Sequence, residues 1–111
     1  MAEHVIALTT IGSEEDASRL ARVLIDRRLV ACVNVLPSVR SLYLWKGRVE
    51  DEREHLCILK TRSDRLERLR AAFEELHPYD VPELVVLPIE GGSERYLEWI
   101  DATLGSQAPS Q

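Results

Sequence analysis

Residues 77–83, HPYDVPE, hold a close set of groups that could bind an ion or exchange a proton. The segment combines an imidazole, a phenol and carboxylates, which between them donate and accept hydrogen bonds. Pro78 and Pro82 restrict the backbone on either side of Tyr79 and Asp80, so the side chains between them are held in place. The same residues also suit a rigid connector that follows a helix ending in a histidine. Both interpretations stay open from these residues alone.

The cysteines Cys32 and Cys57 are candidate ligands for a soft metal. Their spacing does not match the closely spaced Cys and His pairs of zinc sites. His55 and Cys57 are two residues apart and share one face of a strand. From the residues alone, a buried structural thiol is the commoner role for Cys57 and also for Cys32. Isolated cysteines in a chain without a signal peptide predict free thiols and a cytoplasmic location.

Several classes of function lack their usual sequence features. The chain has no Walker-type or Rossmann glycine pattern and no nucleophile elbow, so we predict that it is not an enzyme and has no organic cofactor. Its net charge is -5, from 19 acidic and 14 basic residues. Without a cluster of positive charge, nucleic-acid binding is not expected. The apolar runs fall far short of the roughly 20 residues of a membrane span, so no membrane partner is expected.

A single domain covering residues 1–111 must position these groups. We expect order over about residues 3–105 and a frayed polar tail at 106–111. Apolar runs predict strands at 5–11, 30–36, 55–61 and 83–89. The last is expected at an edge or a bulge, because Pro88 cannot donate a ladder hydrogen bond. Helical spacing predicts helices after Ser13, Ser63 and Ser93, each a candidate N-cap.

A long β-hairpin joins the second and third predicted strands. Residues 41–45 alternate between two faces, Lys46-Gly47 is a turn signal, and a polar arm at 48–54 leads back. Pro37, which precedes the hairpin, predicts a bend or an edge position. The order βαββαβ plus a C-terminal helix predicts a ferredoxin-like α+β fold, with an antiparallel sheet and helices on one face. Because the other face would be apolar and uncovered, we expect a symmetric oligomer.

Short motifs in a fixed order resemble those of the CutA family of divalent-cation tolerance proteins. They are ACVN at 31–34, SLYLWKG at 41–47, KT at 60–61, HPYDVPE at 77–83 and YLEW at 96–99. The resemblance covers almost the whole chain, from about Val5 to Leu104. It implies a ferredoxin-like subunit in a tight homotrimer similar in architecture to the PII signalling proteins. It also implies a role in tolerance of divalent ions, with copper bound by some members.

The resemblance further implies a cleft between subunits. From it we expect Cys32 and His77 as metal ligands. We expect the ligand cleft to include Tyr43, Trp45, Glu54, Lys60, Tyr79, Glu83 and Trp99. Some bacterial members have further thiols proposed as copper ligands, but the corresponding positions here are Thr9 and Ala72. A site built from several different cysteines of one chain is therefore not expected.

Three functions stay open at this point. The first is a homotrimer that binds a divalent cation, with copper as the leading candidate. The second is a PII-like regulatory trimer that binds a small anionic metabolite in the cleft, where Lys60 would supply the positive charge. The third is a structural trimer that serves as an interaction scaffold.

Overall fold

The computed structural model describes residues 3–106, so the predicted tail lies outside the described residues except for Ser106. The order of elements is β1 (His4–Ile11), α1 (Glu14–Asp26), β2 (Cys32–Trp45), β3 (Arg48–Arg62), α2 (Leu66–Leu76), β4 (Val85–Pro88) and α3 (Glu94–Leu104). A short 3₁₀ helix, η1 (Ser63–Arg65), leads into α2. The predicted βαββαβ order with a C-terminal helix is confirmed.

The four strands of the described chain form one sheet in the order β2-β3-β1-β4. All the pairings are antiparallel, with β1 between β3 and β4. The edge strand β4 is shorter than the predicted strand at 83–89 because only Val85 to Pro88 pair with β1. Proline suits this edge because it lacks the amide proton that an inner strand would need.

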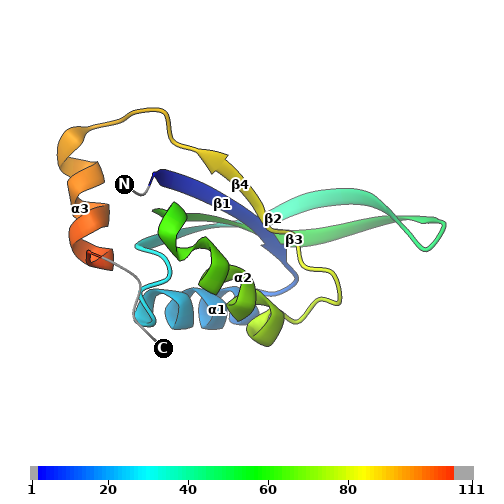
Figure 1. Cartoon of the computed structure of the whole chain (residues 1–111). Helices are drawn as coiled ribbons and strands as arrows, with labels where there is room; N and C mark the ends of the chain where they lie inside the picture. The colour runs from blue at the N-terminus through cyan, green and yellow to red at the C-terminus, as the bar shows by residue number, and fades with distance from the viewer. Residues whose placement is uncertain (1–2, 107–111) are drawn as a thin grey trace.

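The two faces of the sheet differ in what covers them. Alternate residues of β1 are buried, and α1 and α2 pack against that face (Figure 1). We call the opposite face the open face. It carries the partly exposed residues of β1 and their pairing partners on β3 and β2, including Ile6, Leu8, Leu56, Ile58, Lys60, Cys32 and Leu36. Helix α3 lies at one end of the sheet (Figure 1).

The β2-β3 hairpin extends well beyond the rest of the sheet. Pairing of β3 with β1 ends at His55, whereas its pairing with β2 continues to Arg48. The hairpin therefore projects as an arm, which we define as residues 39–54 (Figure 1). The predicted turn is confirmed, since Lys46 has φ 52° and Gly47 has φ 78°, the positive values that a tight two-residue hairpin turn requires.

Pro37 lies at the irregularity from which the arm begins. The β2-β3 register shifts between Leu36 and Val39, and Ser38 has a φ of 59°. An extra residue in one strand bends that strand and increases its twist. The bend predicted at Pro37 is thus confirmed, and it sets the direction in which the arm leaves the sheet.

Two of the three predicted serine caps are confirmed. The hydroxyls of Ser13 and Ser93 accept hydrogen bonds from backbone amides in the first turns of α1 and α3. The prediction that Ser63 caps the second helix is wrong. Ser63 lies in η1, and its hydroxyl accepts a hydrogen bond from the amide of Glu3 at 2.9 Å. Because η1 leads directly into α2, that helix begins without a side-chain cap.

A fully buried arginine fixes the position of α3. Arg65 has no solvent exposure, and its Nε donates to the backbone carbonyl of Arg28 at 3.0 Å. Its Nη2 donates to the carbonyls of Leu104 and Gly105 at the end of α3. The guanidinium group thus satisfies carbonyls that a helix end leaves without partners.

Candidate functional site

Tyr79 and Glu54 form the centre of the candidate site. Tyr79 lies on the loop after α2, and its Oη donates to Glu54 Oε2 of β3 at 2.5 Å. Glu54 is only 4% exposed. A Cβ added to Gly12 would lie 3.2 Å from Tyr79 Oη, so the glycine leaves room for the hydroxyl. Burial and the Glu54 carboxylate raise the pKa of Tyr79, which keeps its phenol a hydrogen-bond donor.

His77 fixes the position of Tyr79 through a hydrogen bond to its backbone. Its Nδ1 accepts a hydrogen bond from the amide of Tyr79 at 3.2 Å. Its Nε2 lies 3.1 Å from the carbonyl oxygen of Thr10 and 3.2 Å from Thr9 Oγ1. Because a carbonyl can only accept, Nε2 carries a proton. Because Nδ1 accepts from an amide, it carries none, so the ring is neutral. Burial lowers the pKa of His77, which favours this state. The HPYDVPE segment is therefore a rigid connector that also positions a polar group.

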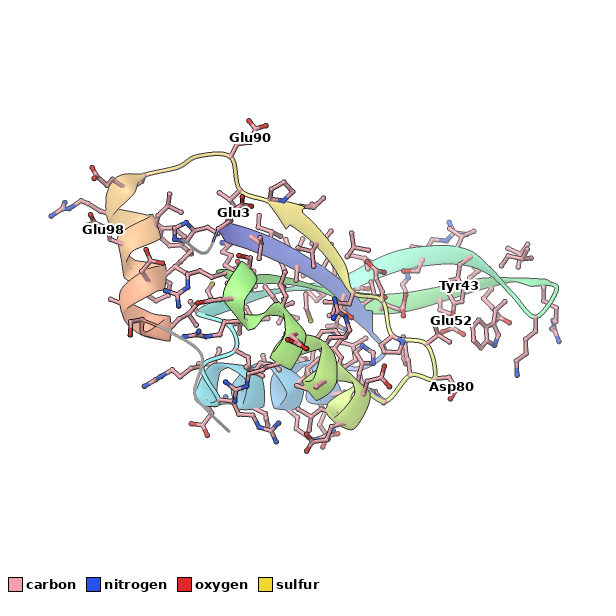
Figure 2. All side chains as sticks on the ribbon, in the orientation of Figure 1. Glu3, Tyr43, Glu52, Asp80, Glu90 and Glu98 are labelled. Carbon is pink, nitrogen blue, oxygen red and sulfur yellow. The ribbon has the colours of Figure 1, made fainter. Side chains whose placement is uncertain are left out.

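A pocket of about 440 Å³ lies beside Tyr79. Five of the residues expected in the cleft line it together: Tyr43, Trp45, Glu54, Tyr79 and Glu83. Figure 2 shows Tyr43, Glu52 and Asp80 on the same side of the molecule, where the arm approaches the loop after α2. We call this space the acidic pocket, because its lining includes the carboxylates of Glu50, Glu52, Glu54, Asp80 and Glu83.

All the ionisable side chains of known sign that line the acidic pocket are carboxylates. Among residues 3–106, no lysine, arginine or histidine lines it. Desolvation raises the pKa of Tyr43, and the negative charges of Glu52, Glu54 and Glu50 raise it further. The sequence reasoning missed Glu50, Glu52 and Asp80 as pocket residues. The signal for the glutamates was their alternation in the strand, since residues two apart share one face.

Three other expected residues lie at the opposite end of the open face. Cys32 pairs with Lys60 across β2 and β3. The Nζ of Lys60 is 5.7 Å from the centroid of the Tyr96 ring, which stacks on Trp99 at 5.5 Å between centroids. Lys60 is the sixth residue after Glu54 along β3, a distance of about 20 Å in a strand. In one chain, therefore, Cys32, Lys60 and Trp99 do not line the acidic pocket.

The two expected metal ligands are also apart within one chain. Cys32 pairs with Lys60, which pairs with Ile6 of β1, whereas His77 contacts β1 at Thr9 and Thr10. Along β1, Ile6 lies about 10 Å from Thr9 and about 13 Å from Thr10. Over residues 3–106, no three His, Cys, Asp or Glu side chains are grouped to hold a metal ion. One chain therefore does not bring Cys32 and His77 together at a common metal.

The two thiols differ in access. Cys32 is partly exposed on the open face, with Sγ 3.8 Å from Asn34 Oδ1. Cys57 is 1% exposed in the core under the helices, and burial raises the pKa of its thiol. The interpretation of Cys57 as a small core residue is confirmed. The same interpretation is wrong for Cys32, which is partly exposed because it lies on the open face and is the accessible thiol of the two.

A match to a known protein family identifies the family to which this chain belongs. Residues 5–103 match the family described as CutA1 divalent ion tolerance protein. The chain belongs to the CutA1 family. The motifs in the sequence and the ferredoxin-like arrangement of the strands agree with this membership.

Relatives from a bacterium and a plant support the same assignment. The divalent-cation tolerance protein CutA of Thermus thermophilus is 41% identical over 100 residues, which cover 90% of this chain and 97% of that protein. The chloroplastic protein CutA of Arabidopsis thaliana is 42% identical over 96 residues, or 86% of this chain. This chain spans only 53% of the length of that plant relative.

A solved CutA1-family structure confirms the fold. The periplasmic divalent cation tolerance protein CutA of Archaeoglobus fulgidus superimposes with a TM-score of 0.88 at 36% identity. The superposition covers 92% of this chain and 99% of that structure. Within residues 3–106, no helix has the length and apolar character needed to span a membrane. Because named relatives are chloroplastic or periplasmic, the cytoplasmic location expected for this chain stays a prediction.

Proposed function

We propose that three copies of this chain assemble into a cytoplasmic homotrimer that binds a divalent cation, with copper as the first candidate. The trimer would act by binding and not by catalysis. Family membership supports the role in divalent-cation tolerance, since the matched family and the Thermus relative both carry that description. The observation that carries the assembly is the open face of the sheet.

The open face and the arm carry large apolar side chains that are exposed to solvent in the single chain. On the open face, Leu36 is 40% exposed and Val85 is 45% exposed. On the arm, Leu44 and Val49 are 71% and 72% exposed. Exposed apolar surface of this kind is usually covered by a partner, and symmetric copies of the same chain are the simplest partner. The projecting arm also gives each copy a means to reach its neighbour (Figure 1).

Cys32 supports copper as the cation because of its position. It is the accessible thiol, and it lies on the face that would meet other copies. Thiolates are soft ligands that select copper over harder ions. Copies that meet at the open face would supply one Cys32 each, so a shared site needs no second cysteine from the same chain. His77 is the weaker of the two expected ligands, because both of its ring nitrogens have hydrogen-bond partners within the chain.

Equilibrium dialysis against copper tests the assignment of Cys32. The wild-type protein, Cys32→Ser and the matched control Cys57→Ala are compared, since each variant keeps one thiol. We expect the control to keep the copper of the wild type and Cys32→Ser to lose most of it. Equal copper in all three would rule out Cys32 as a ligand. Absence of copper from the wild type would favour the structural scaffold.

His77 has its own variant in the same experiment. His77→Gln keeps an amide that can donate toward the carbonyl of Thr10, and it removes the imidazole. We expect copper to be retained, because the imidazole is occupied by Thr10 and Tyr79. Loss of copper from a folded His77→Gln protein would make His77 a second ligand.

Binding of an anionic metabolite is the second candidate function. It depends on Lys60, which lies beside Tyr96 in one chain and does not line the acidic pocket. An anion site would therefore have to form around Lys60 at a contact between copies. A ligand-induced rise in melting temperature that is lost in Lys60→Ala would support it.

A further inference from the structure

We propose that the acidic pocket binds a small organic ammonium ligand, such as a diamine or a polyamine. The inference does not depend on the proposed copper site, because Cys32 does not line this pocket. It also reverses the charge of the metabolite considered above, since this space favours a positive ligand.

The buried carboxylate of Glu54 is the first reason. Glu54 is only 4% exposed, yet within residues 3–106 it has no ion pair, and the neutral phenol of Tyr79 is its hydrogen-bond donor at Oε2. The other oxygen, Oε1, accepts no hydrogen bond within residues 3–106 and is not among their enclosed polar atoms, so it stays accessible at the pocket that Glu54 lines. A carboxylate on a largely buried side chain is stabilised by a counter-charge beside it. A cation in the pocket would supply that pairing.

The aromatic wall is the second reason. Tyr43 and Trp45 come from the arm, and they line the same space as the carboxylates. Both side chains are partly exposed, at 39% and 38%. Aromatic faces attract organic ammonium groups through the ring quadrupole, and tryptophan does so best. Carboxylates beside such rings are a suitable combination for an amine with an apolar body.

The size and arrangement of the pocket favour an organic ligand over a metal ion. A volume of about 440 Å³ falls in the range of small-molecule sites. In the part of the chain that the structure describes, no three acidic or other ligating side chains converge closely enough to hold a metal. Separated carboxylates instead match a ligand whose charges are themselves separated, as in a diamine.

Tryptophan fluorescence tests the proposal with a reporter inside the pocket. The chain has two tryptophans, so a Trp99→Phe variant leaves Trp45 as the single emitter. This protein is titrated with putrescine and with spermidine at about 0.15 M salt, where long-range surface attraction is screened. The uncharged analogue 1,4-butanediol controls for the apolar part of putrescine.

Two matched double variants locate the binding. Glu50→Gln with Glu52→Gln removes two charges from the pocket, while Glu90→Gln with Glu98→Gln removes two charges elsewhere. Glu90 and Glu98 lie far from Tyr43 and Glu52 (Figure 2). We expect the first pair to raise the Kd for amines by about tenfold or more, and the control pair to change it by less than about twofold.

Three results would overturn the proposal. The first is an equal response to putrescine and butanediol, which would show that charge is irrelevant. The second is the same amine affinity in both double variants, which would place binding outside the pocket. The third is a saturable response to Mg²⁺, Zn²⁺ or Cu²⁺ but not to amines, which would make the pocket a metal site. Circular dichroism confirms that each variant is folded.

Discussion

At the scale of single residues, Tyr79 links the loop after α2 to the arm through its hydrogen bond to Glu54. We predict that Tyr79→Phe lowers the free energy of unfolding by about 1–3 kcal/mol, since it leaves a buried carboxylate without its donor. Urea denaturation measures the change. Tyr96→Phe is the control, because no hydrogen bond from residues 3–106 reaches the Tyr96 hydroxyl, and a change within about 0.5 kcal/mol is expected. Equal effects would contradict the role of Tyr79.

His77 predicts a dependence of stability on pH. Burial lowers the pKa of His77 in the folded chain below its ordinary value of 6.5. The unfolded chain therefore binds a proton at this site first as the pH falls. The His77 contribution to the free energy of unfolding is full above about pH 6.5 and is lost as the pH falls toward the folded pKa. Urea denaturation from pH 7.5 to 5 should show a smaller loss in His77→Gln than in wild type. The same loss in both would contradict this prediction.

The sequence was informative about the chemistry of HPYDVPE but not about its partners. Two prolines predicted a rigid segment, and the structure agrees with that interpretation. Glu54 and Thr10, however, are distant in the sequence, and only the packing of β1 and β3 brings them to Tyr79 and His77. Such partners depend on strand register and on the path of the loop, which no local pattern contains.

At the scale of elements, the arm depends on its turn. Gly47 has a φ of 78°, where a side chain is strained, although nothing lies within 4 Å of the position of an added Cβ. We predict that Gly47→Ala destabilises the arm by about 1 kcal/mol. Gly91→Ala is the matched control, since Gly91 is equally uncrowded and has no positive φ. Hydrogen exchange of the amides of residues 39–54 should quicken only in Gly47→Ala. Equal exchange in both variants would contradict the prediction.

The hairpin could be predicted from sequence, whereas the start of α2 could not. Alternation at 41–45 and the Lys46-Gly47 turn are local signals, and both are confirmed. Ser63 offers the same local signal as Ser13, but its hydroxyl bonds to Glu3. The buried position of Arg65 was equally beyond prediction, because the carbonyls that satisfy it lie in other elements.

At the scale of the whole molecule, the proposed assembly depends on the open face. We predict that Leu36→Lys converts the proposed trimer to a monomer, because it places a charge on a face that assembly would bury. Ile25→Lys is the control, since Ile25 is 36% exposed on α1, compared with 40% for Leu36 on the open face. Light scattering after gel filtration measures the mass of each. If Leu36→Lys stays a trimer, the open face is not the interface.

The uncovered face could be inferred from sequence, but the distribution of the expected site residues could not. The βαββαβ order predicted that helices cover one face of the sheet, and α1 and α2 do so. On the open face, α3 meets only the end that holds His4 and Lys60. The resemblance grouped Glu54 and Lys60 in one cleft. In a single chain they share a strand face but lie about 20 Å apart. The spacing along β3 therefore separates an acidic end of the sheet from an end that holds Lys60 and Cys32.

Native mass spectrometry of the full chain, first without metal and then with added copper, tests the central claim most directly. We predict a species of three times the mass of the chain under both conditions. With copper, its mass should rise by bound copper ions, and this rise should be absent from Cys32→Ser. A monomer under both conditions would contradict the proposed assembly. A trimer that takes up copper equally with and without Cys32 would contradict the proposed site.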